Sequence, residues 1–286
     1  MGYVDTLVNG LMVGGLYGLF GLGLAFAFGV MRIVNVAHGE FIVLSAYIGL
    51  VLGQLLPINP ILLVVLVALI AFALGWILQS ALLNRVMGKD PLPPLLLTFG
   101  ISIILRNLLV ERFGANLRTI DVGSVKLAGF DFAGLRIGVL PTIILAVSVA
   151  LFVVLHLVLR HTAFGRTLRA TADDFVIVQL FGVNYRRIYN IAMGLSVGVS
   201  AIAGILLAMR SAFTPFSGVD RILLSFEVVI VGGLGSIWGA MMGGFLLGIT
   251  HLFGLTFDPD SGLLWPHLMF FLILMVLPSG LSQWRR

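Results

Sequence analysis

The chain has 286 residues, of which 60% are hydrophobic and only 10% are charged, with a formal net charge of +5. So few charged side chains cannot cover so much apolar surface in water, which excludes a soluble globular domain. The absence of cysteine excludes disulfides, thiolate catalysis and zinc–thiolate sites. The lipid bilayer must be the solvent for most of the chain.

Long apolar runs without strict apolar/polar alternation predict membrane helices rather than a barrel. We expect an all-α, polytopic transmembrane helical bundle that forms a single domain over residues 1–286. Because a span needs about 20 helical residues, eight full spans are the alternative to nine if a short segment is broken or re-entrant. The nine predicted segments are 7–30, 41–56, 61–79, 94–113, 137–159, 190–209, 222–234, 237–255 and 265–281.

Basic residues predict the orientation of these segments. The longest basic connection, 160–189, is expected on the cytoplasmic side, which then carries ten basic residues against six on the other side. This places the N-terminus outside and the C-terminus inside. The basic character therefore reflects membrane topology, and we expect no nucleic-acid partner. No basic residue precedes Arg32, so the first apolar stretch is expected to stay as a membrane helix.

Two series of glycines recur every four residues and so lie on one face of a helix. Missing side chains let another backbone approach closely. We expect them to pack helices within one subunit, with a subunit interface as the alternative. The two series are Gly10, Gly14, Gly18 and Gly235, Gly239, Gly243.

A polar cluster interrupts the apolar runs at MRIVNVAHGEF, residues 31–41. Asn35, His38 and Glu40 mark either a polar corner against the transport path or a partner, or a turn solvated by water and headgroups. A single His and a single Glu two residues apart do not make a metal site.

The segment 94–113 carries a polar stripe, because Thr98, Ser102 and Arg106 are spaced by four residues. The stripe could line a translocation path. Alternatively Arg106 extends outward to the interface and the hydroxyls bond to the preceding turn.

Glu227 is a lone carboxylate in the apolar stretch ILLSFEVVIV. Such a group needs a partner, or it must be protonated. It is either a pathway residue or a structural link to another helix, and the sequence names no partner.

The basic connection predicts a short amphipathic helix. Thr171 is expected to cap it, Asp173 and Asp174 to lie in its first turn, and Gly182 to end it. Such a helix in a cytoplasmic loop could lie on the membrane or dock into a partner.

Several motifs are absent. The only Gly-Lys pair, Gly88-Lys89, is followed by Asp90, so no P-loop is present, and no hydrolase, zincin or dinucleotide motif occurs. We therefore expect no catalytic residue, no enzymatic activity of its own and no cofactor.

Four stretches together resemble one family. They are FGVMRIVNVAHGEFIVLSAYIG (28–49), TAFGRTLRATADDFVIVQLFGVN (162–184), the Pro215…Gly218 pair, and VGGLGSIWGAMMGGFLLG (231–248). The chain looks like the membrane permease subunit of the branched-chain amino acid ABC importers, in the subunit type that carries Ala-His-Gly-Glu.

The resemblance implies a transport subunit in a bacterial or archaeal plasma membrane. Its partners would be a second homologous permease, two cytoplasmic ATPases, an external substrate-binding protein and membrane lipid. The 162–184 stretch matches the loop that contacts the ATPase, which favours partner docking for the short helix. The residues it assigns to that loop are Gly165, Arg166, Arg169, Ala170, Asp173, Asp174 and Gly182.

Two other functions stay open. Permeases for urea or short amides share most of these stretches. A stand-alone secondary transporter or channel would need intramembrane charges for coupling, for which Arg106 and Glu227 are the candidates.

Overall fold

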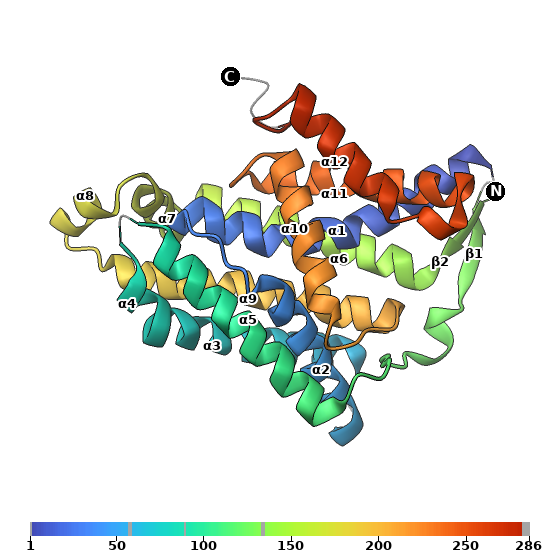
Figure 1. The fold of residues 1–286 in the computed structure, drawn as a ribbon, viewed down its shortest axis with the longest axis horizontal. Helices are drawn as coiled ribbons and strands as arrows, with labels where there is room; N and C mark the ends of the chain where they lie inside the picture. Colours follow the sequence, from blue (N-terminus) through green and yellow to red (C-terminus); the bar gives the residue numbers. More distant parts are fainter. Residues whose placement is uncertain (1, 57–58, 89, 133–134, 282–286) are drawn as a thin grey trace.

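The computed structural model describes residues 2–56, 59–88, 90–132 and 135–281, and it is an all-α membrane bundle (Figure 1). In these residues, seven helices are long and apolar enough to cross a membrane. They are α1 (Tyr3–Met31), α2 (His38–Leu55), α3 (Pro60–Leu78) with its continuation to Val86, α5 (Leu92–Phe113), α6 (Val139–His161), α9 (Tyr185–Arg210) and α11 (Ile237–Phe257).

Shorter elements complete the fold. The continuation of α3 is a π-helical turn (Gln79–Leu83) and α4 (Asn84–Val86). The other short helices are α7 (Ala163–Asp173), α8 (Phe175–Leu180), α10 (Ser217–Gly232) and α12 (Leu264–Val276), with 3₁₀ turns at Gly123–Lys126 and Pro259–Ser261. Strands β1 (Gly129–Phe132) and β2 (Leu135–Gly138) pair antiparallel.

Each of the nine predicted segments corresponds to a helix, with shifted ends. The predicted segment 222–234 is α10, which begins at Ser217, and the predicted segment 265–281 ends earlier, at Val276 of α12. The connection 114–136, which lies between two predicted segments, contains the 3₁₀ turn and most of the hairpin. Three basic residues of the charge count, Lys89, Arg285 and Arg286, lie outside the described residues.

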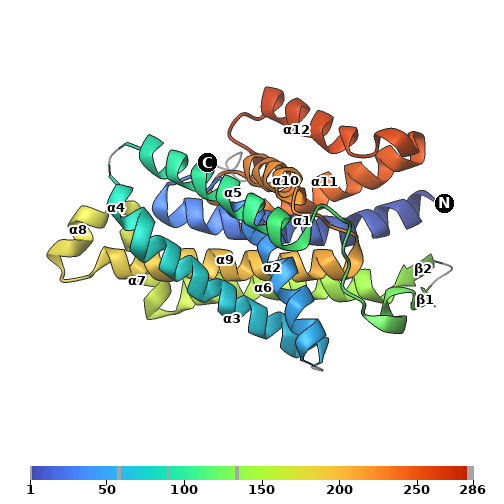
Figure 2. The ribbon, with the colours of Figure 1, turned by 60° about the horizontal axis from the view of Figure 1, so that its bottom comes forward.

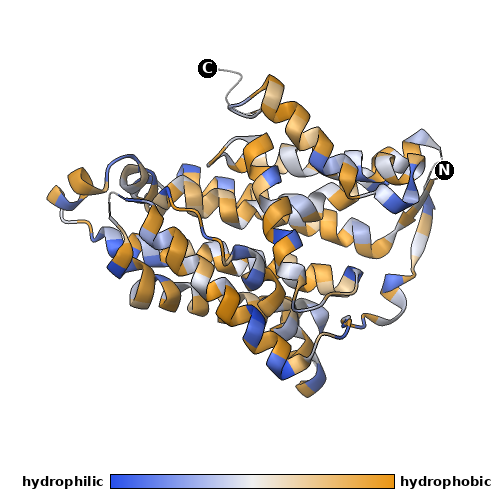
Figure 3. Ribbon diagram, viewed as in Figure 1, coloured by the Kyte–Doolittle hydropathy of each residue, from blue (hydrophilic) through white to orange (hydrophobic). Residues whose placement is uncertain are grey.

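Helices α1 and α9 form the centre of the bundle. The apolar window of α1 is 89% buried and that of α9 is 78% buried, against 22% for α5 and for α6. The outer helices also consist mostly of hydrophobic residues (Figure 3), many of them exposed. A helix that is apolar all round and exposed belongs in lipid, so the outer helices face the bilayer or another membrane subunit.

The helices form two halves of inverted orientation. Helix α1 packs against α11 and α10, while α9, which runs the opposite way, packs against α3 and α2 (Figures 1 and 2). The short helices α2 and α10 meet in the middle of the bundle, where a Cβ on Gly39 would lie 2.1 Å from the carbonyl oxygen of Gly218. The series α1–α2–α3–α5 and α9–α10–α11–α12 thus repeat one pattern of contacts, as in transporters built from inverted repeats.

The two ends of the bundle carry different elements (Figure 1). Tyr3 and the β1–β2 hairpin lie at one end, called here the N-terminal end, and α7 and α8 lie at the other, the α7–α8 end. The last described residues return to the α7–α8 end, because Gly280 packs on Gly233, close to where Gly235 touches Gly29 in the last turns of α1. The first and the last described residues therefore lie at opposite ends of the bundle, as predicted for the two termini; which end faces the cytoplasm stays a prediction.

The predicted glycine series pack helices within the chain. A Cβ on Gly10 or Gly14 would lie 2.8 or 2.6 Å from a backbone Cα of α11. A Cβ on Gly18 would lie 3.7 Å from the Cα of Met241, also in α11. Gly239 and Gly243 pack instead against the backbone of α10. Gly235 was expected on the same helix face, but it precedes α11 and adopts φ +80° in the turn.

Candidate functional site

The segment between α1 and α2 forms a buried polar corner. Asn35, His38 and Glu40 are 1%, 1% and 2% exposed, so the alternative of a solvated turn is wrong for these three side chains. The His38 Nε2 atom lies 2.8 Å from the carbonyl oxygen of Phe20 in α1. The Asn35 amide oxygen accepts from the backbone N–H of Ala37 at 3.1 Å and holds the start of α2.

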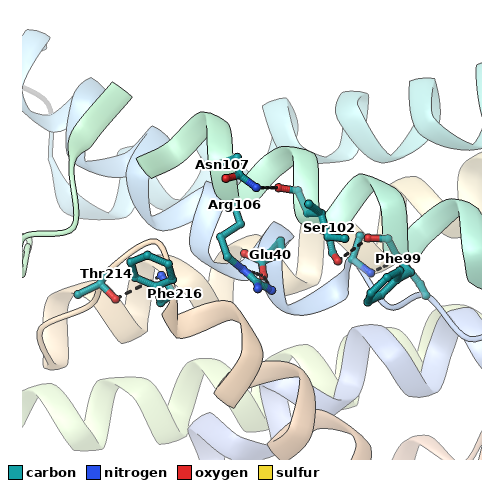
Figure 4. Close-up of polar contacts among 10 residues, drawn as sticks. Glu40, Phe99, Ser102, Arg106, Asn107, Thr214 and Phe216 are labelled. Carbon is teal, nitrogen blue, oxygen red and sulfur yellow. Dashed lines mark hydrogen bonds and ion pairs between the residues drawn. The ribbon is translucent and has the colours of Figure 1, made fainter. Parts of the chain in front are cut away.

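The polar stripe of α5 faces this corner. The Thr98 hydroxyl oxygen accepts from the backbone N–H of Val36 at 3.1 Å, and the Arg106 Nε and Nη2 atoms donate to Glu40 Oε1 at 3.0 and 2.5 Å (Figure 4). The hydroxyls of Thr98 and Ser102 also donate to carbonyls of the preceding turn. The shared face is confirmed, and Arg106 points into the protein rather than outward to the interface.

Glu227 in α10 has the partner that the sequence did not reveal. Its carboxylate bonds to Nδ1 of His267 in α12, and the side chains are 10% and 35% exposed. Sequence reasoning did not single out His267. The available signal was a histidine in the second apolar segment after that of Glu227, but nothing in the spacing says that the two side chains meet.

A second group of polar residues, which sequence reasoning missed, lies toward the N-terminal end. Tyr17 of α1 bonds through its hydroxyl to Nδ1 of His251 in α11, at 2.6 Å, and the two rings stack. Arg210 and Arg221 line the same cavity of about 400 Å³. Both arginines are among the six basic residues counted on the side opposite the cytoplasm, because each lies just outside a predicted apolar segment.

The expected short amphipathic helix is two helices. Thr162 caps α7 by accepting from the N–H of Gly165 at 3.0 Å, and Asp174 caps α8 by accepting from the N–H groups of Val176 and Ile177 at 2.8 and 3.0 Å. The prediction that Thr171 is the cap was wrong, because α7 continues through Thr171 and buries it. Gly182 ends the segment with φ +78°, as expected.

The surface of this segment is polar on α7 and apolar on α8. Arg166, Arg169, Ala170, Asp173 and Asp174 are exposed, and the Arg169 guanidinium donates to the carbonyl of Leu159, which ties α7 to α6. A separate set of exposed apolar side chains covers α8: Val176, Ile177, Leu180 and Phe181. Gly165 is buried against the backbone of α6 and allows the tight turn.

Among the described residues, no three His, Cys, Asp or Glu side chains lie close enough together to hold a metal ion. The polar groups instead form hydrogen-bonded pairs between helices. They can hold helix positions, and at the N-terminal end they leave a cavity with cationic walls.

Comparison with known proteins gives one family. A family profile described as the branched-chain amino acid transport system permease component matches residues 6–277. The high-affinity branched-chain amino acid transport permease BraD of Pseudomonas aeruginosa is 31% identical over 88% of this chain and 86% of its own length. LivH of Escherichia coli, with the same description, is 26% identical over 98% and 95%.

A solved structure shares the fold. PsaBC from Streptococcus pneumoniae, in complex with Fab, matches with a TM-score of 0.52 and 15% identity, over 97% of this chain and 96% of that one.

Proposed function

The chain belongs to the family of branched-chain amino acid transport permease components and is a permease subunit of an ABC importer, and from this premise we propose that it carries branched-chain amino acids. The observation that supports this most is the extent of the match, from residue 6 to residue 277, which takes in every helix from α1 to α12. We infer one permease domain over residues 1–286 in a bacterial or archaeal plasma membrane.

The proposed assembly follows from this role. A second homologous permease would complete the pathway, an external binding protein would deliver the substrate, and two ATP-binding subunits would supply the work at the cytoplasmic face. Exposed apolar surface on α5 and α6 is available to lipid or to the second permease.

The α7–α8 segment is the proposed contact with the ATPase. Leu180 and Phe181 are each 82% exposed at the end of the bundle, and an apolar helix end of this kind fits a groove in a partner. Arg169 ties α7 to α6, so that force on α8 would reach the membrane helices. Closure of the ATPases would thus move the membrane helices between outward- and inward-facing states.

The experiment is to replace Leu180 or Phe181 by Asp in the complete transporter and to measure ATPase co-purification and leucine uptake. We expect both to fall about tenfold or more, because a carboxylate in an apolar contact is costly. Arg169→Ala should lower uptake more than co-purification. The control is Leu127→Asp, which is 86% exposed in the connection before β1. Normal co-purification and uptake in the α8 variants would contradict the docking site.

The substrate is tested separately. Competition of branched-chain amino acids, urea and short amides against labelled leucine uptake by the wild-type transporter distinguishes the substrate classes. Uptake by the chain alone, without ATPases, would instead indicate a secondary transporter.

A further inference from the structure

A cavity of about 400 Å³ extends from the N-terminal end toward the middle of the bundle, between α1, α9, α10, α11 and α12. It reaches Tyr17, half-way along α1. Its lining combines aliphatic side chains with two basic ones, Arg210 and Arg221. The aliphatic set includes Leu16, Leu207 and Leu223 and is called here the leucine wall. The volume and the mixed walls are those of a site for a small amphipathic molecule.

Neither arginine of the cavity forms a salt bridge with a carboxylate among the described residues. The Arg210 Nη1 and Arg221 Nε atoms are buried and have no hydrogen-bond partner among the described residues. The guanidinium of Arg221 lies over the ring of Phe20, with the Cζ atom 5.6 Å from the ring centroid. A buried guanidinium group without a counter-anion is costly, so an anion that enters the cavity beside these two groups would be stabilised.

The carboxylates nearby do not supply that anion. Glu227 is bonded to His267, whose ring lines the cavity. Asp220 also lines the cavity and its charge acts on Arg221, but within the described chain it forms a salt bridge with neither arginine. His251 is bonded to Tyr17 and adds no negative charge.

We propose that this cavity binds an aliphatic amino acid in transit, with Arg210 and Arg221 on its carboxylate and the leucine wall on its side chain. The guanidinium group matches a carboxylate in geometry and charge, and aliphatic walls favour a branched apolar side chain. The position, reaching the middle of an inverted repeat, is where transporters hold their substrates. This inference rests on the proposed substrate class and names the residues of this subunit that recognise it.

The first test uses the complete transporter in liposomes, with its binding protein. Arg210→Gln and Arg221→Gln should lower ATP-driven leucine uptake about tenfold or more, while stimulation of ATP hydrolysis by the loaded binding protein stays near normal. Lysine at either position should restore part of the uptake. The matched control, Arg112→Gln, removes an exposed arginine at the C-terminal end of α5 and should change neither quantity.

Two results would overturn the site. One is normal uptake in both glutamine variants. The other is loss of ATPase stimulation together with weaker attachment of the binding protein, which would assign the arginines to an acidic residue of that partner. A wild-type transporter that does not carry branched-chain amino acids would contradict the proposed function instead.

A second test does not need transport, and it uses the absence of native cysteines. With Leu223→Cys in the cavity lining, a negatively charged thiol reagent should label this chain several-fold faster than a positively charged one, because Arg210 and Arg221 line the same cavity. Leucine should slow the labelling, and leucinamide, which lacks the carboxylate, should not. Equal protection by both, or protection by phosphate lipids but not by leucine, would overturn the proposal.

Discussion

The two inverted halves of the bundle each hold a buried carboxylate against a base on a later helix, but the bases differ. In the first half, Arg106 of α5 holds Glu40 of α2, whose side chain is 2% exposed. In the second half, His267 of α12 holds Glu227 of α10, and these side chains are 10% and 35% exposed. Arg106 is itself 28% exposed, so the Arg106–Glu40 pair is the more buried of the two. The His267–Glu227 pair is more open to water and should hold its helices less firmly.

The two central helix contacts, the α1–α11 and α3–α9 seams, differ in how closely their backbones approach. Along α1–α11 the glycines touch backbone, and a Cβ on Gly244 would lie 2.4 Å from the N atom of Gly18. Along α3–α9, a Cβ on Gly194 would lie 2.9 Å from the ring of Phe72 and 3.0 Å from its carbonyl oxygen. The backbone approach is closer at Gly244, so the α1–α11 seam is the less tolerant of the two.

The largest effect is expected from Gly244→Val. It forces α1 and α11 apart, and we expect a loss of about 3 kcal/mol or more in stability, with little folded protein recovered. Thermal unfolding in detergent and folded yield by size exclusion measure this. Gly194→Val should cost less, and Gly100→Val on α5 should be nearly neutral because nothing lies within 4 Å of its Cβ position. A greater loss from Gly194→Val would reverse the comparison of the seams.

Arg106→Met should come next. It leaves the Glu40 carboxylate buried without a counter-charge, at a cost of about 3–5 kcal/mol. Adding Glu40→Gln should recover a large part of that loss, because no charge then remains buried. Thermal unfolding of the two single variants and the double variant gives the coupling between the side chains. Additive losses would show that the pair is not the link described here.

His267→Phe should have a smaller effect, about 1–3 kcal/mol, because the pair is more exposed and the carboxylate of Glu227 has more access to water. The same unfolding measurement tests this, with Glu227→Gln as the companion variant. A loss as large as that of Arg106→Met would remove the distinction between a more buried and a more open pair.

Hydropathy alone predicted the helices, because lipid requires each span to satisfy its own backbone. Four-residue spacing was enough to place Thr98, Ser102 and Arg106 on one face. The partners of that face were beyond the sequence, since Arg106 meets Glu40 across 66 positions and His267 meets Glu227 across 40. Such pairs are fixed by how the halves fold together.

Local capping was predicted less well. Thr171 and Asp174 both precede a helical pattern, and only the tertiary packing that buries Thr171 inside α7 decides between them. Arg210 and Arg221 were used only to predict membrane orientation, because a count of basic residues in the connections says nothing about burial. The cavity of the further inference is therefore visible only in three dimensions.

The second half has one feature without a counterpart in the first: the α7–α8 segment leads into α9, and Gly182 ends it at φ +78°. In Gly182→Ala the added Cβ would meet no atom within 4 Å. The loss of stability in this turn is therefore due to backbone strain alone and is about 1 kcal/mol. That strain acts on an exposed segment, so global thermal stability should hardly change while uptake by the complete transporter falls about two- to fivefold. Ser124→Ala, in the exposed connection before β1, is the control and should alter neither quantity. A drop in melting temperature without loss of uptake would mean that the turn supports the bundle rather than the contact with the ATPase.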